Sequence, residues 1–466
     1  MDCLLGIDCG LTLVKACVFT PSGVKLKEVS RKTPLKHGEI DTAALINGVC
    51  ECVREASEGC NILAVGLSGH GNGLYALDNK LKPLIALPSM GSAEDVYLSD
   101  PERYYTITRQ SCWAGQPMQL IRMLKIKHTD IYGKIRTVLH CKDFVRLMLT
   151  GILGTDYTDA SASGLLSIED GKYSDELFEL AELEINSSVL PEMYDSYNII
   201  GNVTLEASKL TGLKEGTPVT AGMIDLNACM AGTGALSDDV YSVTAGTWGI
   251  STRMTDKIID SRSITQNTYC IDRAHRMAVV SSPTSCVNLN WFLEKCMPGC
   301  TYDTANSIAG RFKPGECRAI YLPYLYTDMA RPGIKAGFSG VTTDTDLDEL
   351  LRSVYEGVMF AHKDQLERLK KAGLPASRIR LSGGAANAMF WKQLFADGLE
   401  LPIETTREKQ AGALGAAMAA AVGIGIYPDI NKAVNEMVKL DERIIPADPG
   451  AYNTKFNEFM ELVGEV

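Results

Sequence analysis

The sequence predicts an α/β protein of two domains, each built on a mixed β-sheet. A chain of 466 residues is too long for one ordinary hydrophobic core, which favours two domains. Its first part shows the pattern of two antiparallel strands, a helix and a further strand, which differs from a Rossmann unit. A second series of strands begins at Pro218 and again at Val240, and strands in both series end in turns of small residues.

The N-terminal elements follow each other with clear boundaries. Residues 4–7 are apolar and stop at an aspartate, and the apolar pattern resumes over residues 15–20 before a Pro-Ser-Gly turn. Residues 41–57 show a helical pattern, with Asp41 placed to cap the helix. Residues 61–68 form a further apolar run that predicts a buried strand.

The remaining chain supports the division into two parts. Residues 101–210 are mostly helical in pattern, with polar turns between the helices. The small, polar residues 235–239 indicate a boundary, so we expect an N-terminal domain over 1–236 and a C-terminal domain over 237–466. The Ala/Gly-rich residues 411–426 are fewer than the roughly 20 needed to cross a membrane, which favours a buried helix.

Composition limits the partners and the compartment. The net charge of −11 and the isoelectric point near 5.2 argue against nucleic acid as the main partner, because phosphate backbones recruit Lys/Arg surfaces. The 14 cysteines contain no C-x-x-C pair, the 6 histidines show no metal-binding spacing, and the N-terminus lacks the basic segment of an export signal. We therefore expect a cytoplasmic protein with reduced thiols and no membrane association. The sequence allows a homodimer.

The first turn of small residues, Asp8-Cys9-Gly10-Leu11-Thr12, has the composition of a phosphate-binding turn. Gly10 lets backbone N–H groups approach an anion, and the Thr12 hydroxyl can donate to it. A carboxylate beside phosphates is favourable when Mg²⁺ lies between them, because Mg²⁺ prefers oxygen ligands and keeps several waters. Asp-x-Gly is also a common turn, so these residues alone leave both interpretations open.

Two later loops have a similar character. Gly246 and Thr247 lie in a run of small residues and hydroxyls after a predicted strand, which suits either a phosphate loop or a plain tight turn. Gly383 and Gly384 follow a basic strand and precede a helix, a place where a backbone turn can contact a nucleotide. The chain contains neither the Walker pattern nor a Rossmann fingerprint after a strand.

Asp225 is the candidate general base. It follows the apolar, glycine-containing stretch 222–224 and is placed to face a cleft and accept a hydroxyl proton. Phosphoryl transfer needs little more from a protein than a positioned base, a metal and electrostatic support. The segment alone also fits a helix N-cap, since residues 228–232 are helical in pattern.

Taken in order along the chain, these segments resemble the FGGY family of carbohydrate kinases. Residues 8–12 match the first phosphate motif of that family, 222–227 the segment of its catalytic aspartate, 246–247 its second phosphate motif and 383–384 its adenosine turn. Further matches follow in the same order at 322–325, 331–332, 337–340, 356–358, 391–397 and 412–417. The resemblance covers nearly the whole chain.

The resemblance implies two actin-like ATPase (ribonuclease H-like) domains that flank a central cleft, with ATP and Mg²⁺ bound in the cleft. It implies that Asp225 is the general base and that Asp8 and Asp225 hold Mg²⁺ through water. The nucleotide contacts that it implies are Thr12, Gly246, Thr247, Cys286, Asn290, Gly383, Gly384 and Asn387.

The sugar pocket of the family corresponds to residues 68–78. His70 and Asn72 offer a donor and acceptor pair for hydroxyls, although an Asn-Gly pair also suits a hairpin turn. The segments 108–117 and 281–291 resemble the matching regions of bacterial L-xylulose kinases. Trp113, in the first of these segments, could pack against a sugar or belong to the hydrophobic core. The implied substrate contacts are His70, Gly71, Asn72, Trp113, Asp225 and Asn227. The expected substrate is a ketopentose such as L-xylulose, with another pentulose or a polyol such as erythritol or glycerol as the alternative.

One departure from the family concerns the sugar end of the cleft. Met90 and Gly91 stand where family members commonly carry an Asp followed by an Arg that contacts the sugar. Loss of a charge-assisted hydrogen bond removes on the order of 1.5–3 kcal/mol. The departure leaves room for a smaller or less hydroxylated substrate, and for a non-catalytic sugar sensor. An actin-like ATPase without sugar chemistry is the other rival.

Overall fold

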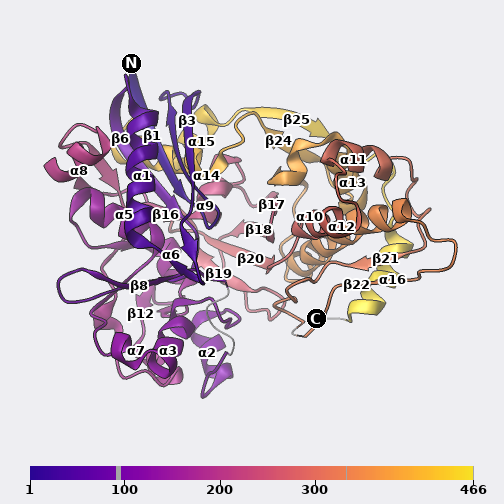
Figure 1. Cartoon of the computed structure of the whole chain (residues 1–466), viewed down its shortest axis with the longest axis horizontal. Coiled ribbons are helices and arrows are strands. Elements are labelled where there is room, and N and C mark those ends of the chain that lie inside the picture. Colours follow the sequence, from indigo (N-terminus) through magenta and orange to yellow (C-terminus); the bar gives the residue numbers. More distant parts are fainter. Residues whose placement is uncertain (91–95, 332, 465–466) are drawn as a thin grey trace.

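The computed structural model describes residues 1–90, 96–331 and 333–464. Within these ranges the chain forms two lobes, and each lobe is built on a seven-stranded mixed sheet (Figure 1). The first sheet has the strand order β14-β15-β6-β1-β2-β3, with β16 also paired to β6. Its strands are β1 (Asp2–Cys9), β2 (Leu13–Phe19), β3 (Lys25–Lys32), β6 (Asn61–Gly69), β14 (Ile199–Asn202), β15 (Pro218–Thr220) and β16 (Met223–Ile224).

The second sheet has the order β19-β20-β18-β17-β23-β24-β25. Its strands are β17 (Val240–Ala245), β18 (Gly249–Thr255), β19 (Gln266–Tyr269), β20 (Arg276–Ser282), β23 (Arg378–Ser382), β24 (Ile403–Thr406) and β25 (Leu440–Ile444). In both sheets the first strand pairs antiparallel with the next strand and parallel with a later one, as β1 does with β2 and β6, and β17 with β18 and β23. The two lobes therefore share one core topology, and the expected pair of mixed-sheet domains is confirmed.

The predicted N-terminal elements are confirmed with small differences at their ends. The strands expected over 4–7, 15–20 and 61–68 are β1, β2 and β6. Helix α1 (Thr42–Ser57) begins where Asp41 caps it, because the Asp41 side chain accepts a hydrogen bond from the backbone N–H of Ala44.

The expectation that 101–210 is mostly helical is only partly right. Short strands interrupt the helices of this region, and two- to four-residue strands carry too little alternation to be seen in a sequence pattern. The helices are α2 (Pro101–Thr108), α3 (Pro117–Lys127), α4 (Thr129–Tyr132), α5 (Cys141–Thr150), α6 (Tyr157–Ala162), α7 (Asp175–Leu180) and α8 (Leu205–Thr211). The strands are β9 (Thr137–Leu139), β10 (Thr155–Asp156), β11 (Leu166–Ser167), β12 (Lys172–Tyr173), β13 (Met193–Tyr194) and β14.

Helices of the second half cover the second sheet, with one exception. They are α10 (Val287–Cys296), α11 (Tyr302–Ala309), α12 (Leu347–Lys371), α13 (Met389–Leu399) and α16 (Asn453–Val463). The exception is the pair α14 (Ala411–Gly423) and α15 (Ile430–Met437), which lies with β1–β3 in the first lobe although α13 and α16 lie in the other (Figure 1). These two helices therefore belong to the C-terminal half of the sequence but pack in the N-terminal lobe.

The contact between α14 and the first sheet is a backbone contact. A Cβ atom at Gly6 of β1 would lie 1.9 Å from the Ala413 carbonyl oxygen, and one at Gly66 of β6 would lie 1.8 Å from that of Ala416. Both strands thus need glycine at the point where the helix crosses them. The helix is buried over Ala411–Ala421, which confirms the buried helix expected there.

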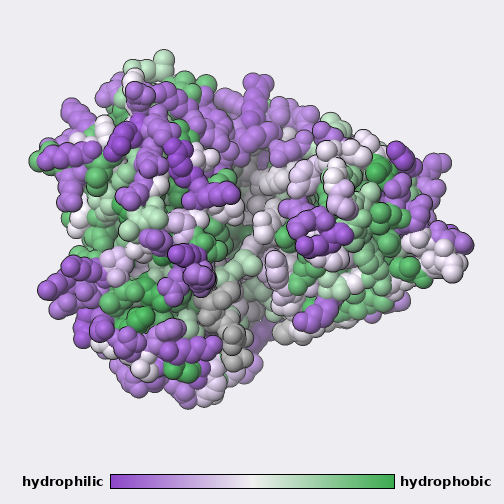
Figure 2. All heavy atoms as spheres, in the orientation of Figure 1, coloured by the Kyte–Doolittle hydropathy of each residue, from purple (hydrophilic) through white to green (hydrophobic). Residues whose placement is uncertain are grey.

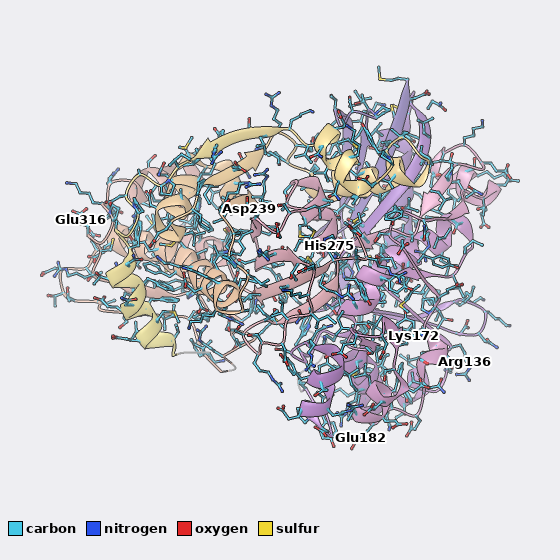
Figure 3. The ribbon with its side chains drawn as sticks, turned by 180° about the vertical axis from the view of Figure 1, so that it is seen from behind. Arg136, Lys172, Glu182, Asp239, His275 and Glu316 are labelled. Atoms are coloured by element: carbon cyan, nitrogen blue, oxygen red, sulfur yellow. The ribbon has the colours of Figure 1, made fainter. Side chains whose placement is uncertain are left out.

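A hydrophobic cluster joins the two lobes around this helix. It combines Leu4 and Ala64 of the first sheet, Val240 and Val279 of the second, and the inner face of α14. Asp239, just before β17, lies near the junction of the lobes in the view from behind (Figure 3). We keep 236/237 as the proposed boundary of the two domains, with α14 and α15 packing back onto the first.

Two further sequence expectations concern surface and thiols. None of the helices in the described ranges combines the length and the hydropathy that crossing a bilayer requires. Hydrophilic residues cover much of the outer surface of the larger lobe in Figure 2. All 14 cysteines lie within the described residues as free thiols, and most are buried.

We predict that Gly66→Ala lowers the free energy of unfolding by roughly 3 kcal/mol or more, because the new methyl group overlaps the Ala416 carbonyl. Gly48→Ala is the matched control. Gly48 lies in α1, where a Cβ would meet its first neighbour at 3.9 Å, so alanine should stabilise by about 0.5–1 kcal/mol. Urea unfolding of the two variants measures both changes in the free energy of unfolding. Equal changes would contradict the backbone contact between β6 and α14.

Candidate active site

A small cavity of about 170 Å³ lies between the two lobes, where the surface dips in Figure 2. Its first wall comes from the loop after β6, the residues before α3 and the start of α9 (Asp225–Gly232). Its second wall comes from the β17–β18 turn, β18, β19, β20 and the loop that contains Met329. The lining residues are Leu11, His70, Gly71, Asn72, Ser89, Trp113, Ile224, Asp225, Leu226, Trp248, Ile250, Gln266, Ser281 and Met329.

Three polar atoms of the lining side chains are buried and have no hydrogen-bond partner among the described residues. They are Nδ1 of His70, Oδ1 of Asn72 and Nε1 of Trp113. Buried polar groups are nearly always hydrogen-bonded, since an unmet one costs on the order of 1–3 kcal/mol. A cavity with three such groups is prepared for a polar ligand.

The loop after β6 holds these groups in place. A Cβ at Gly71 would lie 2.6 Å from Cδ1 of Ile224, so a larger residue there would have to displace the side chain that precedes α9. Asn72 adopts a left-handed conformation with φ of 58°, and Gly73 follows with φ of 76°. The hairpin alternative for this Asn-Gly pair is wrong, because β6 and β7 (Leu74–Leu77) belong to different sheets.

Asp225 lies at the floor of the cavity. It is the first residue of α9, and the cap position is occupied by Ile224 without any side-chain hydrogen bond, so the capping alternative is wrong. Burial raises the pKa of the Asp225 carboxyl to about 7, and repulsion from Asp8 adds to the shift, while His70 opposes it. The group can therefore exchange a proton near neutral pH.

Asp8 is the last residue but one of β1 (Asp2–Cys9) and lies near Asp225. Its Oδ1 atom accepts a hydrogen bond of 2.6 Å from the Ser68 hydroxyl. The first turn of α14 leaves space for the carboxylate, because a Cβ at Gly412 would lie 2.8 Å from its Oδ2 atom. Among the described residues, no group of three or more His, Cys, Asp or Glu side chains is arranged to hold a metal ion.

A second cavity, of about 450 Å³, lies within the second lobe. It is lined by the β17–β18 turn, the first turns of α10 and α11, and the loop between β23 and α13. Six residues expected to contact the nucleotide lie together here: Gly246, Thr247, Cys286, Asn290, Gly384 and Asn387. Trp391 and Tyr302 add aromatic surface to the same wall.

Two other residues expected at the nucleotide site lie outside this lining. Gly383 sits directly below it with φ of 84°, where a Cβ would lie 2.5 Å from the Ala245 carbonyl oxygen. Thr12 is exposed in the turn between β1 and β2, and its carbonyl accepts a hydrogen bond from Thr33. The structure therefore gives Gly383 a place beneath the loop and leaves Thr12 away from both cavities.

The β17–β18 turn connects the two cavities. Gly246 and Thr247 line the larger cavity, and the next residue, Trp248, lines the smaller one. The indole N–H of Trp248 donates to the Met90 sulfur over 2.9 Å, and its ring packs edge-on against Trp113 at 5.8 Å between centroids. Met90 thus contacts a residue that lines the small cavity, whereas Gly91 is outside the described residues.

Asn227 is not brought to the cavity. Its side-chain amide donates to the Tyr269 carbonyl over 3.2 Å, and its Oδ1 atom accepts from the backbone N–H of Ile271 over 2.8 Å. These bonds tie α9 of the first lobe to the second sheet. The side chain therefore has a structural use, and the substrate contact that the resemblance implied stays a prediction.

Several lining residues were not among the expected contacts. Trp248 stands within the loop that the sequence singled out, so its bulk beside small residues is a signal that could have been used. Gln266 and Met329 carry no local signal, because they reach the cavity only when the lobes meet, whereas Ser281 belongs to the segment 281–291 that the sequence singled out.

Comparison with known proteins now adds to this geometry. The model of the N-terminal domain of the FGGY family of carbohydrate kinases matches residues 3–232, and the model of its C-terminal domain matches residues 241–424. The chain belongs to the FGGY family of carbohydrate kinases. It is therefore a sugar or polyol kinase, and ATP is the phosphate donor expected for the family.

Relatives of this FGGY kinase are similar over their whole length. A probable L-xylulose kinase of Haemophilus influenzae is 29% identical, with 99% of each chain covered. The L-xylulose/3-keto-L-gulonate kinase of Escherichia coli is 30% identical, with 98% of this chain and 96% of that protein covered. A ligand-bound xylulose kinase from Lactobacillus acidophilus superposes with a TM-score of 0.89 at 23% identity, covering 99% and 98% of the two chains, and shows the same fold.

A buried ionic cluster supports the sugar side of this FGGY kinase. Lys142 of α5 is fully buried, and its Nζ lies 2.7 Å from Asp143, 3.0 Å from Asp156 and 3.0 Å from Asp159. Although burial opposes the charge, these carboxylates raise the pKa of Lys142. The Thr158 hydroxyl donates to Asp156 and accepts from the backbone N–H of Ile224. The cluster thereby holds the residue that precedes Asp225.

We predict that Lys142→Met lowers the free energy of unfolding by about 3–5 kcal/mol, because it removes the buried cation that Asp156 and Asp159 share with Asp143, which also pairs with Arg146. Lys432→Met is the matched control. Lys432 forms an exposed i,i+4 pair with Glu436, and its loss should cost less than about 0.5 kcal/mol. Chemical unfolding of both variants makes the comparison. A loss below about 1 kcal/mol for Lys142→Met would show that the cluster is dispensable.

Proposed function

We propose that this kinase transfers the γ-phosphoryl group of ATP to a hydroxyl of a ketopentose, with L-xylulose as the first candidate. The observation that carries the proposal is the pair of cavities joined by one turn: a small one at Asp225, with buried polar atoms in its wall, and a larger one in the second lobe. Phosphoryl transfer needs an acceptor and a donor in line, and this arrangement suits it. The similarity to L-xylulose kinases supports the choice of sugar.

In this proposal ATP occupies the larger cavity. Gly246 and Thr247 offer backbone N–H groups and a hydroxyl to its phosphates, and the loop at Gly384 approaches the adenosine. The γ-phosphate then points along the β17–β18 turn toward Asp225. Asn290, Cys286 and Asn387 complete the nucleotide wall.

Asp225 is the proposed general base. The substrate hydroxyl loses its proton to the carboxylate as its oxygen forms a bond to the γ-phosphorus, and the bond from that phosphorus to the bridging oxygen of ADP breaks. A base works best when its pKa lies near the operating pH, and the pKa of Asp225 is raised to about 7. The unpartnered atoms of His70, Asn72 and Trp113 supply hydrogen bonds that hold the sugar.

Asp8 and Asp225 fit a Mg²⁺ ion that is held through water. Their carboxylates repel each other enough to contribute to the raised pKa of Asp225, and a cation between them and the phosphates would relieve that repulsion. The ion, when bound, would neutralise charge that develops on the phosphate oxygens. Carboxylate oxygens match the preference of Mg²⁺ for oxygen ligands, water and phosphate.

The first prediction concerns substrate and base together. A panel of L-xylulose, D-xylulose, both ribuloses, erythritol and glycerol should give ADP release that is fastest with L-xylulose. Asp225→Asn should lower kcat by about 10²- to 10⁴-fold while the KM for ATP changes little, because a neutral amide cannot take the proton. Asp441→Asn, an exposed substitution on β25, is the control.

Two outcomes would contradict the proposal. ADP release by Asp225→Asn at a near wild-type rate would remove Asp225 from the role of base. ADP release that does not depend on any sugar or polyol would favour the actin-like ATPase, and no release at all would favour a sugar sensor.

The second prediction concerns pH. Only the ionised form of Asp225 accepts a proton, so kcat/KM should fall about tenfold per pH unit as the pH drops below about 7. The profile should level off above that value. A profile that stays flat down to the ordinary aspartate pKa of about 4 would show that Asp225 is not the titrating base.

A further inference from the structure

The β17–β18 turn, which connects the two cavities, is held from behind by a second loop. The backbone N–H of Ser285 donates to the Thr247 carbonyl over 2.9 Å, and that of Cys286 donates to the Gly246 carbonyl over 2.8 Å. The carbonyl oxygens of Gly246 and Thr247 thus face the 285–286 loop. Because a trans peptide directs its N–H opposite to its C=O, the N–H groups of the same two peptides point away from that loop, which suits donation to an anion.

His362 fixes the position of this second loop. It lies in α12, which packs against α10 and β18 in the second lobe (Figure 1). Its Nε2 atom forms a hydrogen bond of 2.9 Å with the Ser285 hydroxyl, and both side chains are buried. The imidazole ring also packs against Phe395, at 5.3 Å between centroids. A hydrogen bond between two buried and closely packed groups leaves Ser285 little freedom to move.

The same helix contacts the far end of the turn. Gly249, the first residue of β18, lies against His362, because a Cβ there would lie 3.3 Å from Nε2 of the ring. The Gln365 side chain donates to the Gly249 carbonyl over 3.1 Å and accepts from the Ser251 hydroxyl over 2.8 Å. Helix α12 therefore holds the turn at its start, through the 285–286 loop, and at its end, through Gly249.

The imidazole of His362 acts without a charge. Burial lowers the pKa of His362 to about 4, so the ring is neutral near pH 7. His362 is not among the described residues that line either cavity. Its effect on a bound phosphate would thus come from the hydrogen bond to Ser285, and a neutral side chain of similar reach should be able to replace it.

We propose that His362 is a positioning residue for phosphoryl transfer: through Ser285 it orients the Gly246–Thr247 turn toward the nucleotide phosphates, without touching the nucleotide. This rests on the proposed function, in which ATP occupies the larger cavity. A misplacement of about 1 Å can slow a reaction on the order of 100-fold, so a small shift of the turn is enough to weaken catalysis.

The main experiment compares three substitutions by calorimetry. His362→Leu keeps a similar volume but removes the hydrogen bond, Ser285→Ala removes its partner, and His362→Gln keeps a polar group of similar reach. The probe is the β,γ-methylene analogue of ATP with Mg²⁺, added without a sugar. Its dissociation constant should rise about threefold or more in His362→Leu and in Ser285→Ala, and less than that in His362→Gln.

Two results of this experiment would overturn the proposal. The first is a rise below about threefold in His362→Leu or in Ser285→Ala. The second is a rise in His362→Gln as large as that in His362→Leu, because the hydrogen bond would then not be the cause.

A double-mutant cycle tests whether the two side chains act together. The double variant of His362→Leu and Ser285→Ala should bind the analogue about as well as the weaker single variant, because both substitutions remove the same hydrogen bond. Effects that multiply in the double variant would overturn the action through Ser285.

Steady-state kinetics separate positioning from a general loosening of the fold. In His362→Leu the KM for ATP should rise about threefold or more, while the KM for the sugar changes by less than about twofold. An equal rise of both KM values would overturn the positioning role.

Ser353→Ala is the matched control. Ser353 is buried nearer the start of α12, where its hydroxyl donates to the Leu350 carbonyl, and its loss should leave analogue binding unchanged. Circular dichroism verifies that each variant is folded. If His362→Leu does not fold, Ser285→Ala carries the test by itself, with the same threshold.

Binding measured without a sugar keeps this inference distinct from the proposed function. Weaker analogue binding in the variants, with no sugar phosphorylated by the wild type, overturns the proposed catalysis alone. Phosphorylation of a sugar, with wild-type analogue binding in His362→Leu, overturns the positioning role alone. Absence of analogue binding by the wild type overturns both.

Discussion

The close backbone contact between α14 and the first sheet is the constraint on which the rest of the structure depends. Gly6 and Gly66 lack the Cβ atoms that would strike the helix, and Gly415 lets α14 approach α9 in the same way. The contact brings a helix from the end of the chain against its first strand. Asp8 and Asp225, at the ends of the elements that α14 touches, thereby share one side of the cleft.

The charges of the cleft follow from that arrangement. Asp225 repels Asp8, and this repulsion destabilises the folded chain at the position where we propose that a proton is taken up. Below them, Lys142 holds three carboxylates in a fully buried cluster that leads to the start of α9. Rigid support under a strained charge keeps the reacting group in position.

Local patterns were sufficient for much of the fold. Alternation and caps predicted β1, β2, β6 and α1, because each of these elements depends mainly on its own residues. The short strands between α2 and α8 were missed, because pairing with distant segments forms them. The Asn72–Gly73 pair was open to a hairpin interpretation, since its positive φ angles suit any tight turn and only the sheet pairing excludes a hairpin.

For the site, the sequence by itself determined the chemistry: a carboxylate at Asp225, a second at Asp8 and small residues at the nucleotide loops, in the order of the FGGY family. Only the tertiary structure decided which groups share a cavity. It placed Trp248 beside the sugar wall and turned Asn227 away from it, because those positions depend on how the lobes meet. The sequence shows which residue types are present and in which order. Which of them line the same cavity wall depends on how distant segments pack together.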